Sequence, residues 1–212
     1  MITINEKETI KKVTELLESK KRYGIVTYTR SALLSAVGDL RGDKKPPKYF
    51  SKSILSGLTN QDKNFIKATQ PSMLEDIHEK IAKAGLNNEN FYSSGFLEYY
   101  INNNHDIFDT FMTYYVKNSK AVVVSFQYKS LISKYFTKDS HFIHIPYNDY
   151  YDKIDSIVDQ VASLNGDYDL CVLDCPMFSS AIAPRIWEKT QMSILDLGKS
   201  LTVARAVAKA RV

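Results

Sequence analysis

The chain has 212 residues, of which 44% are hydrophobic and 25% are charged, and its formal net charge at pH 7 is +4. This composition is typical of a globular protein with a substantial core, and no apolar run approaches the ~20 residues that span a bilayer. The opening residues, MITINEKETIKK, lack the apolar segment of a signal peptide, so we expect a cytoplasmic location and no membrane span. The mild excess of positive charge is compatible with a polyanionic partner but does not identify one.

The first elements of the chain are a helix, a strand and a second helix. Residues 5–19 predict a helix, because Asn5 and Glu8 are spaced as a capping box ahead of an apolar face. Residues 23–28 are rich in β-branched and aromatic side chains and predict a strand, which leads into a helix over 31–37. The turn between them carries one cation and two hydroxyl groups, on Thr29, Arg30 and Ser31.

Residues 40–118 differ in character from the rest of the chain. A basic, proline-bearing loop is followed by short amphipathic pieces, by a helix that begins at Pro71, and by two aromatic-rich helices over 88–101 and 106–116. We predict that this region is an all-helical insertion between the first strand and the rest of the sheet, within a single domain over 1–212.

From residue 120 onward, apolar strands alternate regularly with helices. Strands are expected at 121–126, 142–145, 169–173 and 193–197, and the helix over 149–164 has one apolar face. Alternation of this kind favours parallel pairing with right-handed crossovers. The sequence therefore predicts a Rossmann-like α/β fold, with a mostly parallel sheet, helices on both faces and the helical insertion after the first strand.

Two aspartates end predicted buried strands, and parallel sheets bind ligands at the carboxyl ends of their strands. Asp174 and Asp196 are unusual in such positions, because a buried carboxylate is costly without a partner. Each could accept a proton from a hydroxyl group, hold a metal ion or bind a ribose, and the alternative is a helix cap or a salt bridge.

Small polar residues follow the same two strands and are candidates for binding a phosphate or diphosphate at helix amino termini. These residues are Ser179, Ser180, Gly198 and Lys199. The alternative is that the serines cap helices and that Lys199 is solvated. The sequence has no G-x-G-x-x-G, P-loop or G-x-S-x-G motif, which argues against a dinucleotide-dependent enzyme, a P-loop NTPase and a hydrolase.

Basic residues gather in two further segments, and together they are candidates for binding a nucleic-acid backbone. The alternative is an ordinary solvated surface. The candidates are Arg41, Lys44, Lys45 and Lys48 in the proline-bearing loop and Arg205 and Lys209 near the carboxyl terminus.

Three segments of the carboxyl-terminal half, 120–124, 145–151 and 193–198, follow one another in an order that resembles the GT-D class of nucleotide-sugar glycosyltransferases. In that class a segment with proline and asparagine precedes a helix, and an Asp-hydrophobic-Gly segment ends the sheet. The class also has an Asp-x-Glu metal motif after its first strand, where this sequence has Thr27 to Ala32 without a carboxylate. A divalent ion, Mn²⁺ or Mg²⁺, would therefore lack its usual ligands, and Arg30 could supply the positive charge instead.

The resemblance implies a transferase that moves a sugar from a UDP-type nucleotide-sugar to a hydroxyl acceptor. The acceptor would be a glycan or a hydroxymethylated base in viral DNA, in which case the location would be the host cytoplasm. The expected catalytic residues are Asp174, Asp196 and Arg30. The expected donor-binding residues are Thr29, Ser31, Asn148, Ser179, Ser180, Gly198 and Lys199. The alternative is a non-catalytic Rossmann-like protein that binds a nucleotide or a nucleic acid.

Overall fold

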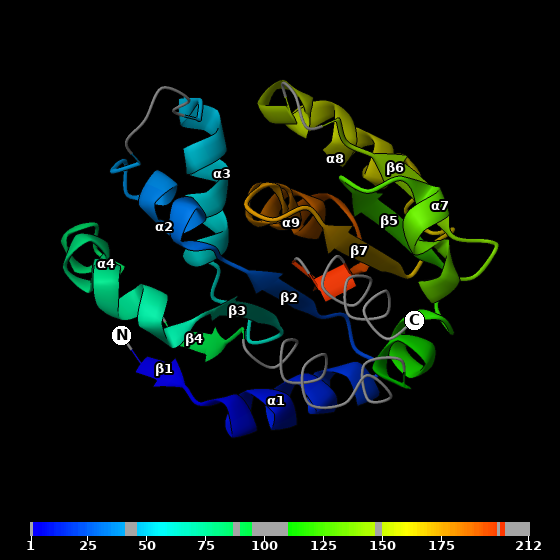
Figure 1. Ribbon diagram of the computed structural model, residues 1–212, viewed down its shortest axis with the longest axis horizontal. Helices are drawn as coiled ribbons and strands as arrows, with labels where there is room; N and C mark the ends of the chain where they lie inside the picture. Colours follow the sequence, from blue (N-terminus) through cyan, green and yellow to red (C-terminus); the bar gives the residue numbers. More distant parts are fainter. Residues whose placement is uncertain are drawn as a thin grey trace, which may run out of the picture.

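The computed structural model describes residues 2–40, 46–86, 90–94, 110–146, 150–198 and 200–201. These residues form an eight-stranded sheet in the order β1-β4-β3-β2-β8-β7-β5-β6, and its strand pairs are all parallel (Figure 1). The prediction of a Rossmann-like parallel α/β fold is confirmed. The strands are β1 (Ile2–Ile4), β2 (Gly24–Thr27), β3 (Phe65–Thr69), β4 (Asn90–Ser93), β5 (Ala121–Ser125), β6 (His141–His144), β7 (Leu170–Asp174) and β8 (Ser193–Asp196).

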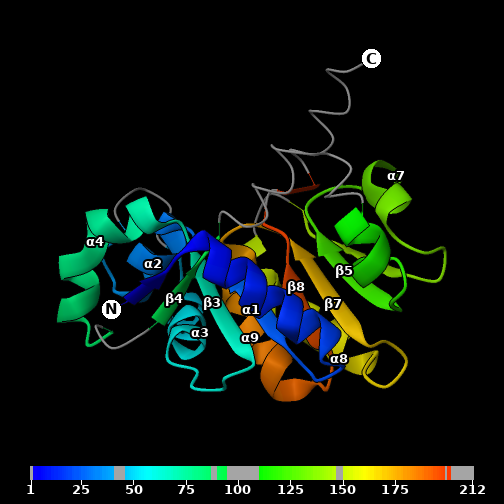
Figure 2. The same ribbon diagram turned by 90° about the horizontal axis from the view of Figure 1, so that it is seen from below.

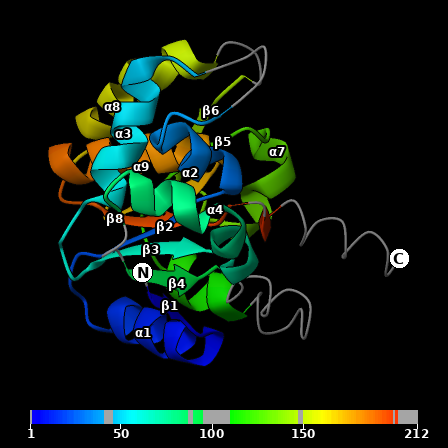
Figure 3. The ribbon, with the colours of Figure 1, turned by 90° about the vertical axis from the view of Figure 1, so that its left-hand side faces the viewer.

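Helices cover both faces of the sheet, as Figures 1 and 3 show for α1 on one side and α3, α8 and α9 on the other. Within the described ranges, no helix is both long and apolar enough to cross a membrane. The α-helices are α1 (Glu6–Glu18), α2 (Arg30–Ala36), α3 (Lys48–Leu58), α4 (Pro71–Lys83), α7 (Lys129–Ile132), α8 (Ile154–Ser163) and α9 (Phe178–Lys189). Shorter helical turns are η1 (Met112–Val116), η2 (Ser133–Tyr135) and η3 (Tyr150–Lys153).

The apolar strands supply side chains to two cores, one on each face of the sheet. In β5, Val122 and Val124 pack with α3, α8 and α9, whereas Val123 packs with α1 and η1. Successive strand residues point to opposite faces, so a strand covered on both sides must be apolar at every position. This requirement explains the continuous run AVVVS in β5.

The predicted capping of the first helix is confirmed. The side-chain oxygen of Asn5 accepts a hydrogen bond from the backbone N–H of Glu8 at 2.9 Å. One turn further, the hydroxyl oxygen of Thr9 accepts the backbone N–H of Ser93 at 3.0 Å, which ties α1 to the end of β4. Figure 2 shows α1 lying across this side of the sheet.

The prediction that residues 40–118 are all-helical is wrong, because β3 and β4 lie in this region and extend the sheet beyond β2. The predicted helix over 88–101 overlaps β4, which is only four residues long. In β3, Lys67 interrupts the apolar run but is buried, since its ammonium group donates to the carbonyl oxygens of Leu58 and Asn60 at 2.9 and 3.1 Å. A buried lysine with backbone partners is not visible in a hydrophobicity pattern.

Helix α3 packs closely against α9 through small residues. The hydroxyl of Ser53 donates to the carbonyl oxygen of Ala181. One turn later Gly57 faces Pro184 of α9 and the Tyr28 hydroxyl, and a Cβ atom at Gly57 would lie 2.6 Å from Cγ of Pro184. Glycine at this position therefore sets the distance between the two helices, and α9 in turn lies directly over β2 and β8.

We expect Gly57→Ala to destabilise the protein by about 1 to 2 kcal/mol, because the strain of the added methyl group outweighs the higher helix propensity of alanine. Urea unfolding measures the change. Ser56→Ala, at the exposed neighbouring position of α3, is the matched control and should change stability by less than about 0.5 kcal/mol. Equal stability of the two variants would show that the α3–α9 contact accommodates a methyl group at position 57 without strain.

Candidate active site

A cavity of about 380 Å³ opens at the carboxyl ends of β2, β3 and β8. It contains the turn after β2 and the turn after β8, which are 165 or more positions apart in the chain but adjacent in the sheet. Five of the predicted site residues meet in its wall: Thr29, Arg30, Ser31, Asp196 and Gly198. The sequence-based expectation of a crevice at the ends of the parallel strands thus corresponds to a cavity in the structure.

Asp196 joins the two turns. Its carboxylate accepts the backbone N–H of Thr27 and the backbone N–H of Gly198, both at 2.9 Å, and the side chain is buried. Gly198 has a φ of +55°, a left-handed conformation that glycine adopts without steric cost. Burial raises the pKa of Asp196 to about 6, although the hydrogen bonds from Gly198, Thr27 and the Ser179 hydroxyl oppose this rise.

Asp174 ends the neighbouring strand β7 and is also buried. Its Oδ2 atom accepts the hydroxyl of Ser125 at 2.7 Å and the side-chain amide of Gln127 at 3.1 Å. Burial raises the pKa of Asp174 to about 7, against the effect of these two hydrogen bonds, and the negative charge of Asp196 raises it further. The two carboxyl groups are therefore electrostatically coupled at the edge of the cavity, although Asp174 is not itself part of the cavity wall.

Thr27 and Ser125 belong to this site and were not identified from the sequence. Thr27 is in the cavity wall, and its Oγ1 atom is buried without a hydrogen-bond partner among the described residues. Both residues are the last of their strands. In the sequence each is only a hydroxyl residue at the carboxyl end of an apolar strand. The strand order makes this position informative, because it places Thr27 beside Asp196 and Ser125 beside Asp174.

The turn after β2 contains both a cap and a cation. The hydroxyl oxygen of Thr29 accepts the backbone N–H of Ala32 at 3.2 Å, so this residue caps α2 as well as lining the cavity. Arg30 is the first residue of α2 and brings a guanidinium to the cavity wall. The cavity wall therefore includes both a cationic residue and the buried Asp196.

The structure does not bring Ser179 and Ser180 to the cavity. Both are buried in the first turn of α9, where Ser179 donates to the carbonyl oxygen of Cys175 at 2.9 Å and Ser180 to that of Met177 at 2.6 Å. Asn148 and Lys199 lie outside the described residues.

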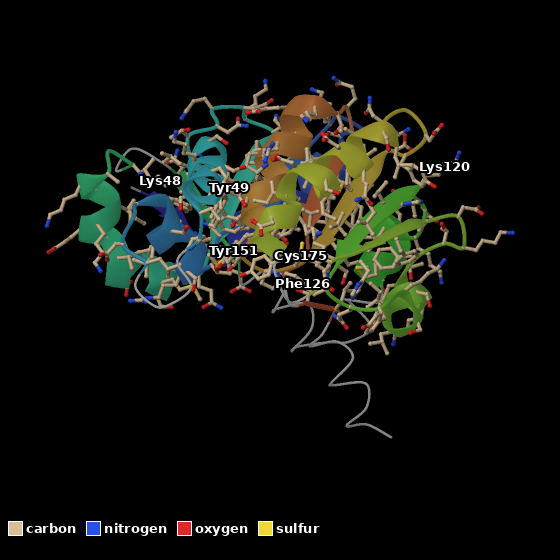
Figure 4. The ribbon with its side chains drawn as sticks, turned by 90° about the horizontal axis from the view of Figure 1, so that it is seen from above. Lys48, Tyr49, Lys120, Phe126, Tyr151 and Cys175 are labelled. Atoms are coloured by element: carbon tan, nitrogen blue, oxygen red, sulfur yellow. The ribbon has the colours of Figure 1, made fainter. Side chains whose placement is uncertain are left out.

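The predicted basic surface is described only in part, because Arg41, Lys44, Lys45, Arg205 and Lys209 lie outside the described residues. Lys48 begins α3 and lines a different cavity together with Lys52. Figure 4 shows Lys48 well apart from Cys175, the residue that follows Asp174. The strand-end cavity and this lysine are therefore separate features.

The described residues do not fit a carboxylate-bound divalent ion. Across them, no group of three or more histidine, cysteine, aspartate and glutamate side chains is arranged to hold a metal. Asp196 is the carboxylate in the cavity wall, and both of its oxygens already accept backbone N–H groups.

No protein-family model matches the sequence, and no curated protein matches it. Solved structures do match. One is described as a new glycosyltransferase (domain of unknown function 1792) from Streptococcus sanguinis, with a TM-score of 0.69 and 10% identity over 99% of this chain and 85% of that chain. Two more represent domain of unknown function 1792, at 10% and 11% identity, with a TM-score of 0.69 and 82% of their chains covered. One of these is described as having a distinct glycosyltransferase fold.

This chain has that glycosyltransferase fold. The likeness extends over nearly the whole chain, whereas the resemblance found in the sequence was limited to the carboxyl-terminal half. At 10–11% identity the match concerns the fold, and the chemistry must be inferred from the residues in the cavity.

The two buried carboxyl groups predict that stability depends on pH. Each has a folded-state pKa above its unfolded value of 3.8, so each contributes full stability below about pH 4 and loses it as the pH rises through about 6 to 7. For Asp174 the difference corresponds to at most about 4 kcal/mol.

We therefore expect Asp174→Asn to unfold at a higher denaturant concentration than wild type at pH 8 and at nearly the same concentration at about pH 3.5, below the unfolded-state pKa. Denaturant titrations at the two pH values measure this. Asp139→Asn alters an exposed aspartate and should leave the pH dependence as in wild type. If Asp174→Asn behaves like Asp139→Asn, the Asp174 carboxyl does not have a raised pKa.

Proposed function

We propose that this protein is a glycosyltransferase that moves a sugar from a nucleotide-sugar donor, of the UDP type that the GT-D resemblance implies, to a hydroxyl acceptor. The observation that carries the proposal is the cavity at the ends of β2 and β8, whose wall includes Arg30 and the buried Asp196, with the buried Asp174 on the neighbouring strand β7. The shared glycosyltransferase fold supports it.

Arg30 is proposed to bind the donor diphosphate. When the bond between the sugar and the diphosphate breaks, negative charge develops on the leaving oxygen, and a fixed guanidinium stabilises that charge. Ser31 is in the same wall and is exposed, so its hydroxyl group can donate a hydrogen bond to a phosphate oxygen. A divalent ion would otherwise neutralise the diphosphate, but the described residues include no cluster of side chains that could hold one. In this scheme Arg30 supplies that positive charge instead.

Asp174 is proposed to be the general base. The acceptor hydroxyl gives its proton to the Asp174 carboxylate, its oxygen forms the new glycosidic bond, and the nucleoside diphosphate leaves with the electron pair of the broken bond. A pKa of about 7 suits this role, because the group is ionised in a useful fraction of molecules and still accepts a proton readily. Asp196 holds the strand ends together, and its charge adds to the rise in the pKa of Asp174 that burial mainly causes.

The donor site is tested by titrating UDP, UDP-glucose and UDP-N-acetylglucosamine, with and without Mn²⁺, while thermal unfolding is followed. We expect stabilisation of the wild type and a loss of affinity of about tenfold or more in Arg30→Gln, which removes the charge that pairs with the diphosphate. Arg30→Lys should recover part of the affinity.

The matched control is Lys48→Gln, which removes a cation from the other cavity and should bind like wild type. If no nucleotide stabilises the wild type, the proposed function is wrong. If Arg30→Gln binds as tightly as Lys48→Gln, the diphosphate lies elsewhere.

The pH profile tests the base. The rate of sugar transfer or donor hydrolysis should rise with pH and level off above about 7 as Asp174 loses its proton. Asp174→Asn should lower the rate by about 100-fold or more. In Asp196→Asn the rise should move to lower pH, because the neighbouring charge that raises the pKa of Asp174 is gone.

Initial rates measured from pH 5 to pH 9 on the wild type, Asp174→Asn and Asp196→Asn test these three expectations. An Asp174→Asn enzyme with the wild-type rate and profile would assign the base to another residue. Nucleotide binding without any turnover would instead indicate a non-catalytic nucleotide-binding protein.

A further inference from the structure

Two aromatic rings are stacked in the open at the same edge of the sheet. The rings of Tyr128 and His144 lie with their centroids 4.5 Å apart and their planes 8° apart. Tyr128 is 66% exposed, and His144 is also exposed. Because the Tyr128 ring is mostly exposed, packing in the core does not explain its fixed position. The stack holds the ring in one plane, so a ligand that binds to it loses little side-chain freedom.

The position of the pair follows from the strand order. Tyr128 comes three residues after β5, and His144 is the last residue of β6, so both lie at the carboxyl edge that carries the cavity. Along this edge the order is Arg30 after β2, Asp196 on β8, Asp174 on β7, then Tyr128 and His144. Neighbouring strands are about 4.8 Å apart, so roughly 10 Å separates the ends of β8 and β5. A sugar ring or two covers that distance.

Hydrogen bonds connect Gln127, the residue before Tyr128, to the end of β5 and to Asp174. The side-chain amide of Gln127 donates to the Asp174 carboxylate, and its backbone N–H donates to the hydroxyl of Ser125 at 2.8 Å. Gln127 is therefore held at both ends, which fixes the direction in which the chain leaves β5 for Tyr128. Leu131, also exposed, lies three residues after Tyr128 in the first turn of α7, and its backbone N–H donates to the carbonyl oxygen of Tyr128 at 2.9 Å.

The chemistry of this edge favours a neutral saccharide over a nucleic acid. The C–H groups on one face of a sugar ring carry partial positive charge and fit the negative face of an aromatic ring. A nucleic-acid strand needs several cations along its backbone. The described edge has two carboxyl groups and, at the cavity, Arg30, whereas beside the stack the ammonium of Lys129 lies over the Phe142 ring, 4.9 Å from its centroid.

We propose that Tyr128 and His144 form a binding subsite for a neutral saccharide, whose ring stacks on the open face of Tyr128. That the saccharide is the acceptor, with a hydroxyl directed toward Asp174, rests on the proposed function; the binding itself does not.

The test uses the full chain and a panel of methyl β-glucoside, methyl β-galactoside, methyl N-acetyl-β-glucosaminide and chitobiose, observed by saturation-transfer NMR. At least one sugar is expected to bind, with the C–H protons of one face shifted upfield by the tyrosine ring. Tyr128→Ala should lower its affinity by about tenfold or more, and Tyr128→Phe should keep it. Tyr114→Ala is the matched control, because Tyr114 is 62% exposed but lines a cavity at the amino ends of β7 and β8.

The proposal is overturned if no sugar of the panel binds to the wild type, or if Tyr128→Ala binds as well as Tyr114→Ala. It is also overturned if a single-stranded oligonucleotide, and no sugar, loses affinity in Tyr128→Ala. Stabilisation by UDP, measured on the same variants, separates the two proposals. Sugar binding that depends on Tyr128 without any effect of UDP retains the subsite and contradicts the transferase. If UDP binds but sugar binding does not depend on Tyr128, the subsite is contradicted and the transferase is retained.

Discussion

The structure depends on the hydrogen bonds by which the Asp196 carboxylate, at the end of β8, holds the end of β2 and the turn at Gly198. The sheet consists of one half with β1 to β4 and another with β5 to β8, and these halves meet where β2 pairs with β8. The paired register at this junction is short, with Gly24 opposite Ile194 and Ile25 opposite Leu195. Beyond it, Asp196 accepts the N–H of Thr27 and continues the connection to the edge of the sheet. A side chain thus replaces the backbone ladder where the strands begin to separate.

The separation of the strands is also what makes the cavity. Because β2 leads to α2 and β8 to the turn at Gly198, the two segments diverge, and polar residues at the strand ends, among them Asp196, share the lining of the space between them with the core residues Tyr28 and Leu197. The price of this arrangement is a pair of buried carboxyl groups whose charges disfavour each other. Such pairs lower stability near neutral pH and are common where a protein needs a proton acceptor.

Much of the carboxyl-terminal half could be predicted, since its strands are apolar on both faces and end sharply at Asp174 and Asp196. The region over 40–118 could not, because β3 contains a buried lysine and β4 has four residues, and neither resembles a strand in a hydrophobicity pattern. Ser179 is a candidate phosphate ligand by sequence, but its hydroxyl donates to the backbone carbonyl of Cys175, between β7 and α9. Thr27 resembles an ordinary strand residue by sequence, and only the folded structure shows that its hydroxyl is buried without a hydrogen-bond partner among the described residues.

The sequence by itself determined the class of fold and the aspartates at the strand ends, because hydrophobic periodicity and the cost of burying a charge are local properties of the chain. Only the tertiary structure decided which strand ends are neighbours. The order β2-β8-β7-β5-β6 brings Arg30, Asp196, Asp174 and the Tyr128–His144 stack into one row, although they are spread over residues 30 to 196. That order results from the packing of helices between distant strands, which no short segment of sequence contains.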